Sequence, residues 1–172
     1  RYMHLCELIP LPTTRQDILD NLETFLTTTL GKGIITAKDT PNFVANRVGV
    51  AGMLATMVEA QKYGIPFDIV DQLTGSKLGR AKSATFRTAD VVGLDTMGHV
   101  IATMQNTLPN DPFAPSYATP AVLKTLVEKG ALGQKTKGGF FKKEGKQIMV
   151  FDANSSSYVP SEGKADEGVL KI

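Results

Sequence analysis

The sequence is poor in the residues on which several specialised protein classes depend. Its 172 residues include one cysteine, Cys6, two histidines and no tryptophan. A single cysteine excludes an intrachain disulfide and is typical of a reducing compartment, so we expect a cytoplasmic protein. Without clustered cysteines or histidines there is no metal-ligand spacing, and no metal site is predicted.

Neither charge nor hydrophobicity accumulates in any long segment. Nineteen Lys and Arg residues oppose 17 Asp and Glu residues, a net charge of +2, and nothing indicates binding to nucleic acid or to an acidic membrane surface. The uncharged, largely apolar stretch over residues 48–58 is only 11 residues long, whereas a membrane span needs roughly 20. A hydrophobic content of 42% is ordinary for a globular domain and can supply a core.

The first 40 residues read as strand, helix and strand. A short apolar strand is expected over 3–9, an amphipathic helix over 15–30 and a second, β-branched strand over 34–37. Gly31-Lys32-Gly33 follows the helix and opens a strand, the reverse of the order in a dinucleotide-binding loop. It is therefore interpreted as a helix C-cap, and no cofactor-binding residue is assigned in this segment.

After Asp39-Thr40-Pro41 the pattern becomes helical. Helices are expected over 43–63, from Pro66 onward, over 85–92 and 94–106, and over 121–129, with a proline-rich loop at 108–120. Residues 147–151 and 158–159 could form a small hairpin, and 161–172 read as a polar linker. The predicted fold class is mainly α, with a short α/β remnant preceding a helical domain.

Two residues are candidates for chemistry. Glu7 is a carboxylate inside the apolar run LCELIP, so it either faces outward from a half-exposed strand or is held for a partner such as an active-site histidine or arginine. Asn46 lies one turn into the helix after DTP, where it is either solvated or a neutral donor to a substrate oxygen. His4 and His99 are each expected to be structural or solvated.

Four segments carry a family resemblance. In this order, HLCELIP, GKGIITAKDTPNFVANR, TADVVGLD and GALGQKTKGGFF resemble the 3-hydroxyacyl-CoA dehydrogenase family, over about residues 3–141. DTPNFVANR is the most specific, because it resembles the family pattern D-T-P-G-F-x-x-N-R, with Asn42 in place of the usual glycine. GSKLGRAKSATFRTADVVGLD and the residues after Phe141 resemble the large multifunctional bacterial forms, which append an enoyl-CoA hydratase domain.

The resemblance implies oxidation of an L-3-hydroxyacyl-CoA to the 3-ketoacyl-CoA by NAD, a step of fatty-acid β-oxidation. The family glutamate that orients the catalytic histidine falls on Glu7, and the asparagine that binds near the reacting oxygen falls on Asn46. The catalytic histidine, in an H-F-F-N-P motif, and the glycine-rich NAD loop would lie before Arg1. The segment alone is therefore expected to be inactive, with NAD bound by the domain upstream.

The resemblance also suggests a domain division and partners. Residues 1–40 would be the end of the NAD-binding Rossmann domain, 41–145 the helical C-terminal domain and 146–172 an extended tail or linker. The expected partners are the acyl-CoA substrate and a second copy, through the helical domain. Two alternatives stay open: a non-catalytic helical dimerisation module, and a dehydrogenase of the same superfamily that acts on a small 3-hydroxy acid.

Overall fold

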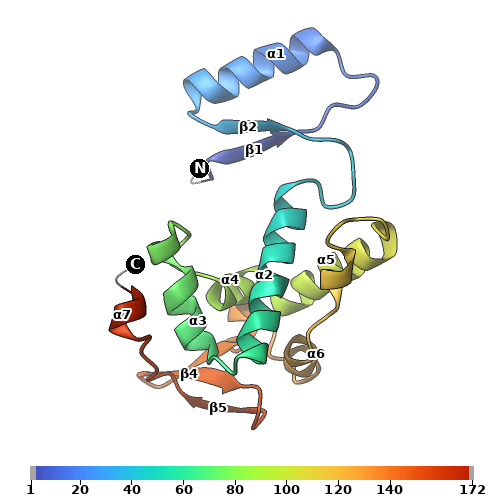
Figure 1. The fold of residues 1–172 in the computed structure, drawn as a ribbon. Coiled ribbons are helices and arrows are strands. Elements are labelled where there is room, and N and C mark those ends of the chain that lie inside the picture. Colours follow the sequence, from blue (N-terminus) through green and yellow to red (C-terminus); the bar gives the residue numbers. More distant parts are fainter. Residues whose placement is uncertain (1–2, 171–172) are drawn as a thin grey trace. The chain divides into compact units, whose positions relative to one another are not determined.

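The computed structural model describes residues 3–170, and the chain divides into two compact units (Figure 1). The first unit spans Arg1–Gly49 and the second Val50–Ile172. The division therefore falls inside the long helix α2 (Ala45–Lys62).

The first unit is the predicted strand–helix–strand element. It contains β1 (Leu5–Leu8), α1 (Gln16–Thr24) and β2 (Gly33–Thr36). The two strands pair in parallel, with Glu7 opposite Ile35. A helix must cross between parallel strands, and α1 is that connection. Gly31 lies at φ +62°, which suits the cap predicted for the end of this helix.

The helix of the first unit changes character before its end. The predicted helix over 15–30 is α-helical only to Thr24 and continues as one π-helical segment, Phe25–Thr29. The hydroxyls of Thr24, Thr27 and Thr28 each donate to the carbonyl four residues earlier. Such bonds compete with the backbone ladder, which accounts for the wider turn.

The first unit buries few apolar side chains. Among its described residues only Leu8 and Ala37 are buried apolar side chains, and α1 buries none. Ile18, Leu22 and Phe25, on the apolar face of this helix, remain 40–52% exposed. The predicted amphipathic pattern is thus present, but within this unit its apolar face has no cover.

The second unit is mainly helical. It contains most of α2, followed by α3 (Phe67–Thr74), η2 (Ser76–Leu78), α4 (Phe86–Val92), α5 (Leu94–Thr107), η3 (Ala114–Tyr117), α6 (Ala121–Glu128), η4 (Gln134–Thr136), β3 (Phe141–Glu144), β4 (Gln147–Asp152), β5 (Ser157–Pro160) and α7 (Glu167–Leu170). The predicted helices are confirmed with boundaries shifted by one or two residues. Within residues 3–170, no helix is both long and apolar enough to cross a membrane.

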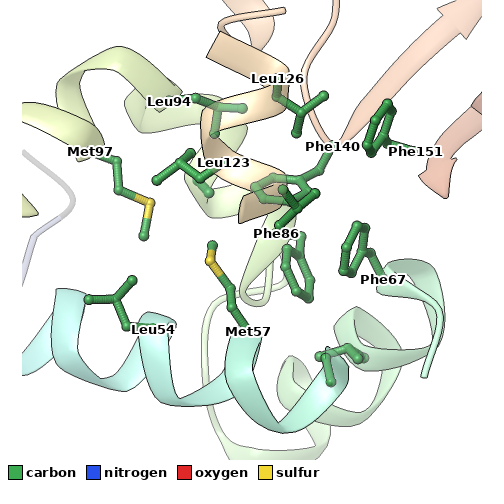
Figure 2. Close-up of a cluster of buried hydrophobic side chains, with 14 of the residues drawn as sticks. Leu54, Met57, Phe67, Phe86, Leu94, Met97, Leu123, Leu126, Phe140 and Phe151 are labelled. Carbon is green, nitrogen blue, oxygen red and sulfur yellow. The ribbon is translucent and has the colours of Figure 1, made fainter. Parts of the chain in front are cut away.

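The core of the second unit gathers one face of each helix. On α2 the buried residues recur every third position: Ala51, Leu54, Met57 and Ala60. Figure 2 shows Leu54 and Met57 facing the side chains of the other helices. Three aromatic rings form its centre, with ring centroids 4.4–5.1 Å apart: Phe67 of α3, Phe86 of α4 and Phe140. Aromatic packing of this kind stabilises a core beyond simple area burial.

The segment expected as a tail or linker, 146–172, contributes to this core. Strands β3, β4 and β5 form an antiparallel sheet in which Val150 pairs with Val159, so the predicted hairpin is confirmed. Val150 and Phe151 are buried in the helical core. Beyond β5, the Gly163 carbonyl accepts a hydrogen bond from Gln72 of α3. Residues 147–163 therefore pack against the helices and do not form an extended linker. The sequence did not indicate this packing, because the partners of these residues lie on helices distant in the sequence.

Candidate active site

The candidate site lies at the carboxyl end of the two parallel strands. Glu7 is the third residue of β1, and the chain leaving β2 runs through residues 37–44 into α2. Because the strands are parallel, their carboxyl ends share one edge. Ligands of open α/β sheets bind outside this edge.

The Glu7 carboxylate holds the start of α2. Its Oε2 accepts the backbone N–H of Val44 at 2.8 Å, and its Oε1 accepts that of Ala45 at 3.1 Å. The first amides of a helix have no partner within the helix, and they favour a negative charge. Glu7 is half-buried, and within the described residues its carboxylate binds these two backbone amides.

The turn before α2 explains the residue that departs from the family pattern. Asn42 has φ +62° and Phe43 has φ +49°, both in the left-handed region. The Phe43 amide donates to the Thr40 carbonyl at 3.0 Å and closes the turn. Glycine adopts such a conformation without strain, and asparagine is one of the few other residues that tolerates it. Asn42 therefore suits the left-handed conformation that this turn requires.

Asn46 lies in the first turn of α2, one residue after an amide that Glu7 binds. Its side chain is exposed and has no hydrogen-bond partner within residues 3–170. The structure thus brings the two predicted site residues to one end of the same helix. His4 and His99 are both exposed.

Two buried carboxylates, Asp71 and Asp90, received no role from the sequence. Asp90, in TADVVGLD, accepts the amides of Phe140 and Phe141, in KGGFF, at 2.8 and 2.9 Å. A Cβ on Gly139 would lie 2.0 Å from its Oδ1. Two segments that carry the family resemblance therefore meet here, in a contact that holds the fold together. The paired glycines were the signal in the sequence, because they mark a close approach of the chain.

Burial sets the protonation of these carboxylates. Asp71 accepts the amides of Thr85, Phe86 and Arg87 at 3.0, 2.7 and 3.0 Å, and so caps α4. Burial raises the pKa of Asp71 above its usual value, against these hydrogen bonds. The pKa of Asp90 is raised to about 6, chiefly by burial, with the charge of Asp71 adding to the effect.

The described residues offer no phosphate-binding loop for NAD. Such a loop joins a strand to a following helix and is rich in glycine. Here the connection from β1 to α1 is IPLPTTR, with two prolines and no glycine. The residues present do not fit the dinucleotide, so no chemistry of NAD is assigned to them. Residues 3–170 also contain no group of three or more potential metal ligands.

Residues 43–143 match the family model described as the C-terminal domain of 3-hydroxyacyl-CoA dehydrogenase. This chain belongs to the 3-hydroxyacyl-CoA dehydrogenase family. The match begins at the turn before α2 and ends within β3, so it covers the helical domain and the Asp90 contact.

Known members of the 3-hydroxyacyl-CoA dehydrogenase family align with most of the chain. A Bacillus subtilis protein named a probable 3-hydroxyacyl-CoA dehydrogenase is 46% identical over 158 residues, which are 92% of this chain and 20% of that protein. A Rickettsia prowazekii protein, named as a candidate trifunctional enzyme of a fatty acid oxidation complex, is 33% identical over 93% of this chain and 23% of its own length. The crystal structure of (S)-3-hydroxybutyryl-CoA dehydrogenase from Ralstonia eutropha matches 80% of this chain and 47% of its own, with a TM-score of 0.64 and 29% identity. The chain thus spans about a fifth of the two relatives and about half of the solved structure.

Proposed function

We propose that this chain is the substrate-side part of an NAD-dependent L-3-hydroxyacyl-CoA dehydrogenase of fatty-acid β-oxidation. The proposed reaction oxidises the C3 hydroxyl of the acyl-CoA to a ketone, with NAD as the oxidant. The observation that carries the proposal is the bond between Glu7 and the start of α2, because it joins both family site residues at one edge of a parallel sheet.

Glu7 is proposed as a positioning residue for a catalytic histidine contributed by the preceding part of the enzyme. Each of its oxygens accepts one backbone amide, and a carboxylate has capacity for about four hydrogen bonds. Another donor can therefore bind it. A carboxylate hydrogen-bonded to an imidazole fixes the tautomer and raises the basicity of the ring. The bonds to Val44 and Ala45 would keep that carboxylate in one orientation.

Asn46 is proposed to donate a hydrogen bond to the substrate oxygen at C3. Its exposed amide has no hydrogen-bond partner within the described residues, so donation to a ligand breaks no existing bond of the side chain. The first turn of α2 is held by Glu7, which limits the positions that this amide can reach. A preorganised donor of this kind stabilises charge that develops on oxygen during the reaction.

The proposed assembly extends beyond the two units. A two-stranded parallel sheet is normally part of a larger sheet covered on both faces, and the exposed apolar face of α1 is consistent with such cover. We propose that the NAD-binding domain supplies it. We propose an appended enoyl-CoA hydratase domain as a further partner, and the relative named as a trifunctional enzyme supports the presence of further domains. We also propose a homodimer formed through the helical part and a cytoplasmic location, the latter supported by the single cysteine.

The substitution Asn46→Ala, in the dehydrogenase that contains this segment, tests the function. We expect kcat to fall about 100- to 1,000-fold, the usual effect of removing a donor to a developing oxyanion. The unfolding free energy should change by less than about 0.5 kcal/mol, because the side chain is exposed. Steady-state kinetics with 3-hydroxyacyl-CoA substrates, and urea unfolding, measure the two quantities.

Glu59→Ala is the matched control, because Glu59 is an exposed polar residue further along α2. It should leave kcat unchanged. If Asn46→Ala also leaves kcat unchanged, Asn46 has no role at the reacting oxygen. Activity toward small 3-hydroxy acids but not acyl-CoAs would overturn the proposed substrate.

A further inference from the structure

The turn before α2 carries an aromatic side chain that lies outside the hydrophobic core. Phe43 is 38% exposed, although phenylalanine is among the residues most often buried. Its ring has no aromatic or cationic partner among residues 3–170. A single exposed ring is common on protein surfaces, so its position in the fold decides its meaning.

Phe43 lies next to both residues of the proposed site. Its neighbour Val44 donates a backbone amide to Glu7 Oε2 at 2.8 Å, and Asn46 follows Phe43 by three residues. Three residues span at most about 11 Å, so the Cα atoms of Phe43 and Asn46 lie within this distance. Phe43 and Asn46 therefore flank the two amides, of Val44 and Ala45, that the Glu7 carboxylate holds.

The backbone of Phe43 is held in a conformation that phenylalanine rarely adopts. Its φ is +49°, in the left-handed region, where a bulky side chain is unfavourable. The hydrogen bond from its amide to the Thr40 carbonyl, 3.0 Å, and the bond from Val44 to Glu7 fix the turn on both sides of the residue. Burial in the core does not offset this strain, which favours a role for the ring in the site rather than in folding.

We propose that Phe43 is a specificity-determining residue that contacts the acyl chain of the substrate beyond C3. This inference rests on the proposed function, in which Asn46 binds the oxygen at C3 and Glu7 positions the histidine. The substrate of that reaction is polar at C3 and apolar from C4 onward. Ligand sites combine a few placed polar groups with apolar walls, and the exposed ring of Phe43 supplies such a wall beside the two polar groups.

The other exposed apolar side chain nearby, Val48, is placed differently. Val48 is 64% exposed and lies two positions beyond Asn46 on α2. Residues two apart on a helix do not face each other, so Val48 does not share the direction of the Asn46 amide. The contact with the acyl chain is therefore assigned to Phe43, and burial of methylenes against its ring favours longer chains.

The dehydrogenase that contains this segment can be assayed with two substrates that differ only in acyl length, 3-hydroxybutyryl-CoA and 3-hydroxyoctanoyl-CoA. Phe43→Gly removes the ring at a position whose backbone suits glycine. We expect kcat/KM for the eight-carbon substrate to fall about tenfold relative to that for the four-carbon substrate, the usual effect of losing contact with one or two methylenes. The loss should appear in KM with kcat retained, because the contacted methylenes do not react.

Phe43→Asn is the second variant, because asparagine tolerates the left-handed conformation and also lacks the ring. It should change the ratio of the two kcat/KM values in the same way. Both variants should unfold within about 4 °C of the wild type, because relief of the backbone strain opposes the loss of a partly exposed ring.

Tyr63→Ala is the control, because it removes a ring that is 66% exposed just beyond the other end of α2. Seventeen residues of helix separate positions 46 and 63 by about 25 Å. The control should leave the ratio of the two kcat/KM values unchanged.

An unchanged ratio in either Phe43 variant would overturn the proposal. An equal fall for both substrates would do the same, because it would trace the effect to the turn and to Asn46 rather than to the acyl chain. A rise for the eight-carbon substrate would show that the ring obstructs longer chains, and would also overturn the contact. None of these results touches the proposed function, which fails only if the wild-type enzyme oxidises neither substrate or if Asn46→Ala leaves kcat unchanged.

Discussion

At the scale of single residues, Glu7 connects the strand edge to the helix that carries Asn46. A carboxylate 37 residues earlier in the chain supplies the cap that a neighbouring Asp39 or Thr40 could have supplied. A distant cap fixes the start of α2 against β1, whereas a local one would fix only the helix. The same side chain can therefore organise the fold and, in the proposed enzyme, a histidine.

Glu7→Gln should loosen the start of α2 in this chain. The glutamine oxygen can accept one of the two amides, but its NH₂ group would face the other donor. The loss of a capping acceptor costs about 1 kcal/mol. Hydrogen exchange of the Val44 and Ala45 amides, followed by NMR, should accelerate roughly fivefold, the equivalent of that energy.

Glu23→Gln provides the comparison, because Glu23 is an exposed carboxylate on α1 whose side chain binds nothing in the described residues. It should leave the exchange of both amides unchanged. If Glu7→Gln also leaves it unchanged, the carboxylate does not hold the helix in solution.

At the scale of elements, the spacing of apolar residues and the positions of proline and glycine predicted most of the fold. The spacing of apolar residues located α2, α5 and α6, and Pro66 and Gly93 marked boundaries, because both signals are local in the chain. The contacts of Glu7 with α2 and of Asp90 with Phe140 join residues 37–50 positions apart. No local pattern encodes such long-range pairs. The sequence could single out Glu7, and it left Asp90 unnoticed, but it could not predict which residues either carboxylate binds. The burial of Val150 and Phe151 escaped prediction for the same reason.

The Asp90 contact makes the link between α4 and β3 dependent on pH. The pKa of Asp90 is about 6 in the folded chain, against an ordinary value of 3.8 for an aspartate. The folded state therefore binds this proton more tightly than the unfolded state does. Its contribution to stability is full below about pH 4 and is lost as the pH rises through about 6. Asp90→Asn cannot titrate, so the unfolding free energy of the wild type relative to this variant should fall between these values, by at most about 1.4 kcal/mol per pH unit.

Urea unfolding followed by circular dichroism at several pH values measures this difference. Asp71, whose pKa is also raised, is present in both proteins, and because its charge acts on Asp90 the difference reports the titration of Asp90 together with this coupling. Glu128→Gln, which changes an exposed carboxylate of α6, should run parallel to the wild type throughout the range. A difference between wild type and Asp90→Asn that does not vary with pH would contradict the buried, titrating carboxylate.

At the scale of the whole molecule, the two units differ in self-sufficiency. The second unit buries a continuous cluster from helices α2 to α6 and strands β3 and β4. The first unit leaves the apolar face of α1 exposed and has only two buried apolar residues. Apolar surface on that scale favours association, which supports the proposed NAD-binding domain as its cover. Helix α2 also carries two exposed apolar residues, Val48 and Val58, in addition to its buried residues.

The proposed homodimer predicts that the chain associates through this exposed side of α2. Val58 is 52% exposed whereas Leu54 and Met57 are buried, so a lysine at 58 would place a charge in the proposed apolar interface and not in the core. Light scattering at tens of micromolar protein should give twice the mass of one chain, falling toward one chain on dilution. Val58→Lys should shift the mass toward one chain at every concentration, because burying an unpaired charge is strongly unfavourable. Thr96→Lys, which adds the same charge at an exposed polar position on α5, should dimerise as the wild type does.

A wild-type mass of one chain, independent of concentration, would mean that this helical side does not pair with a second copy. Equal dissociation by the two lysine variants would trace the effect to net charge rather than to α2.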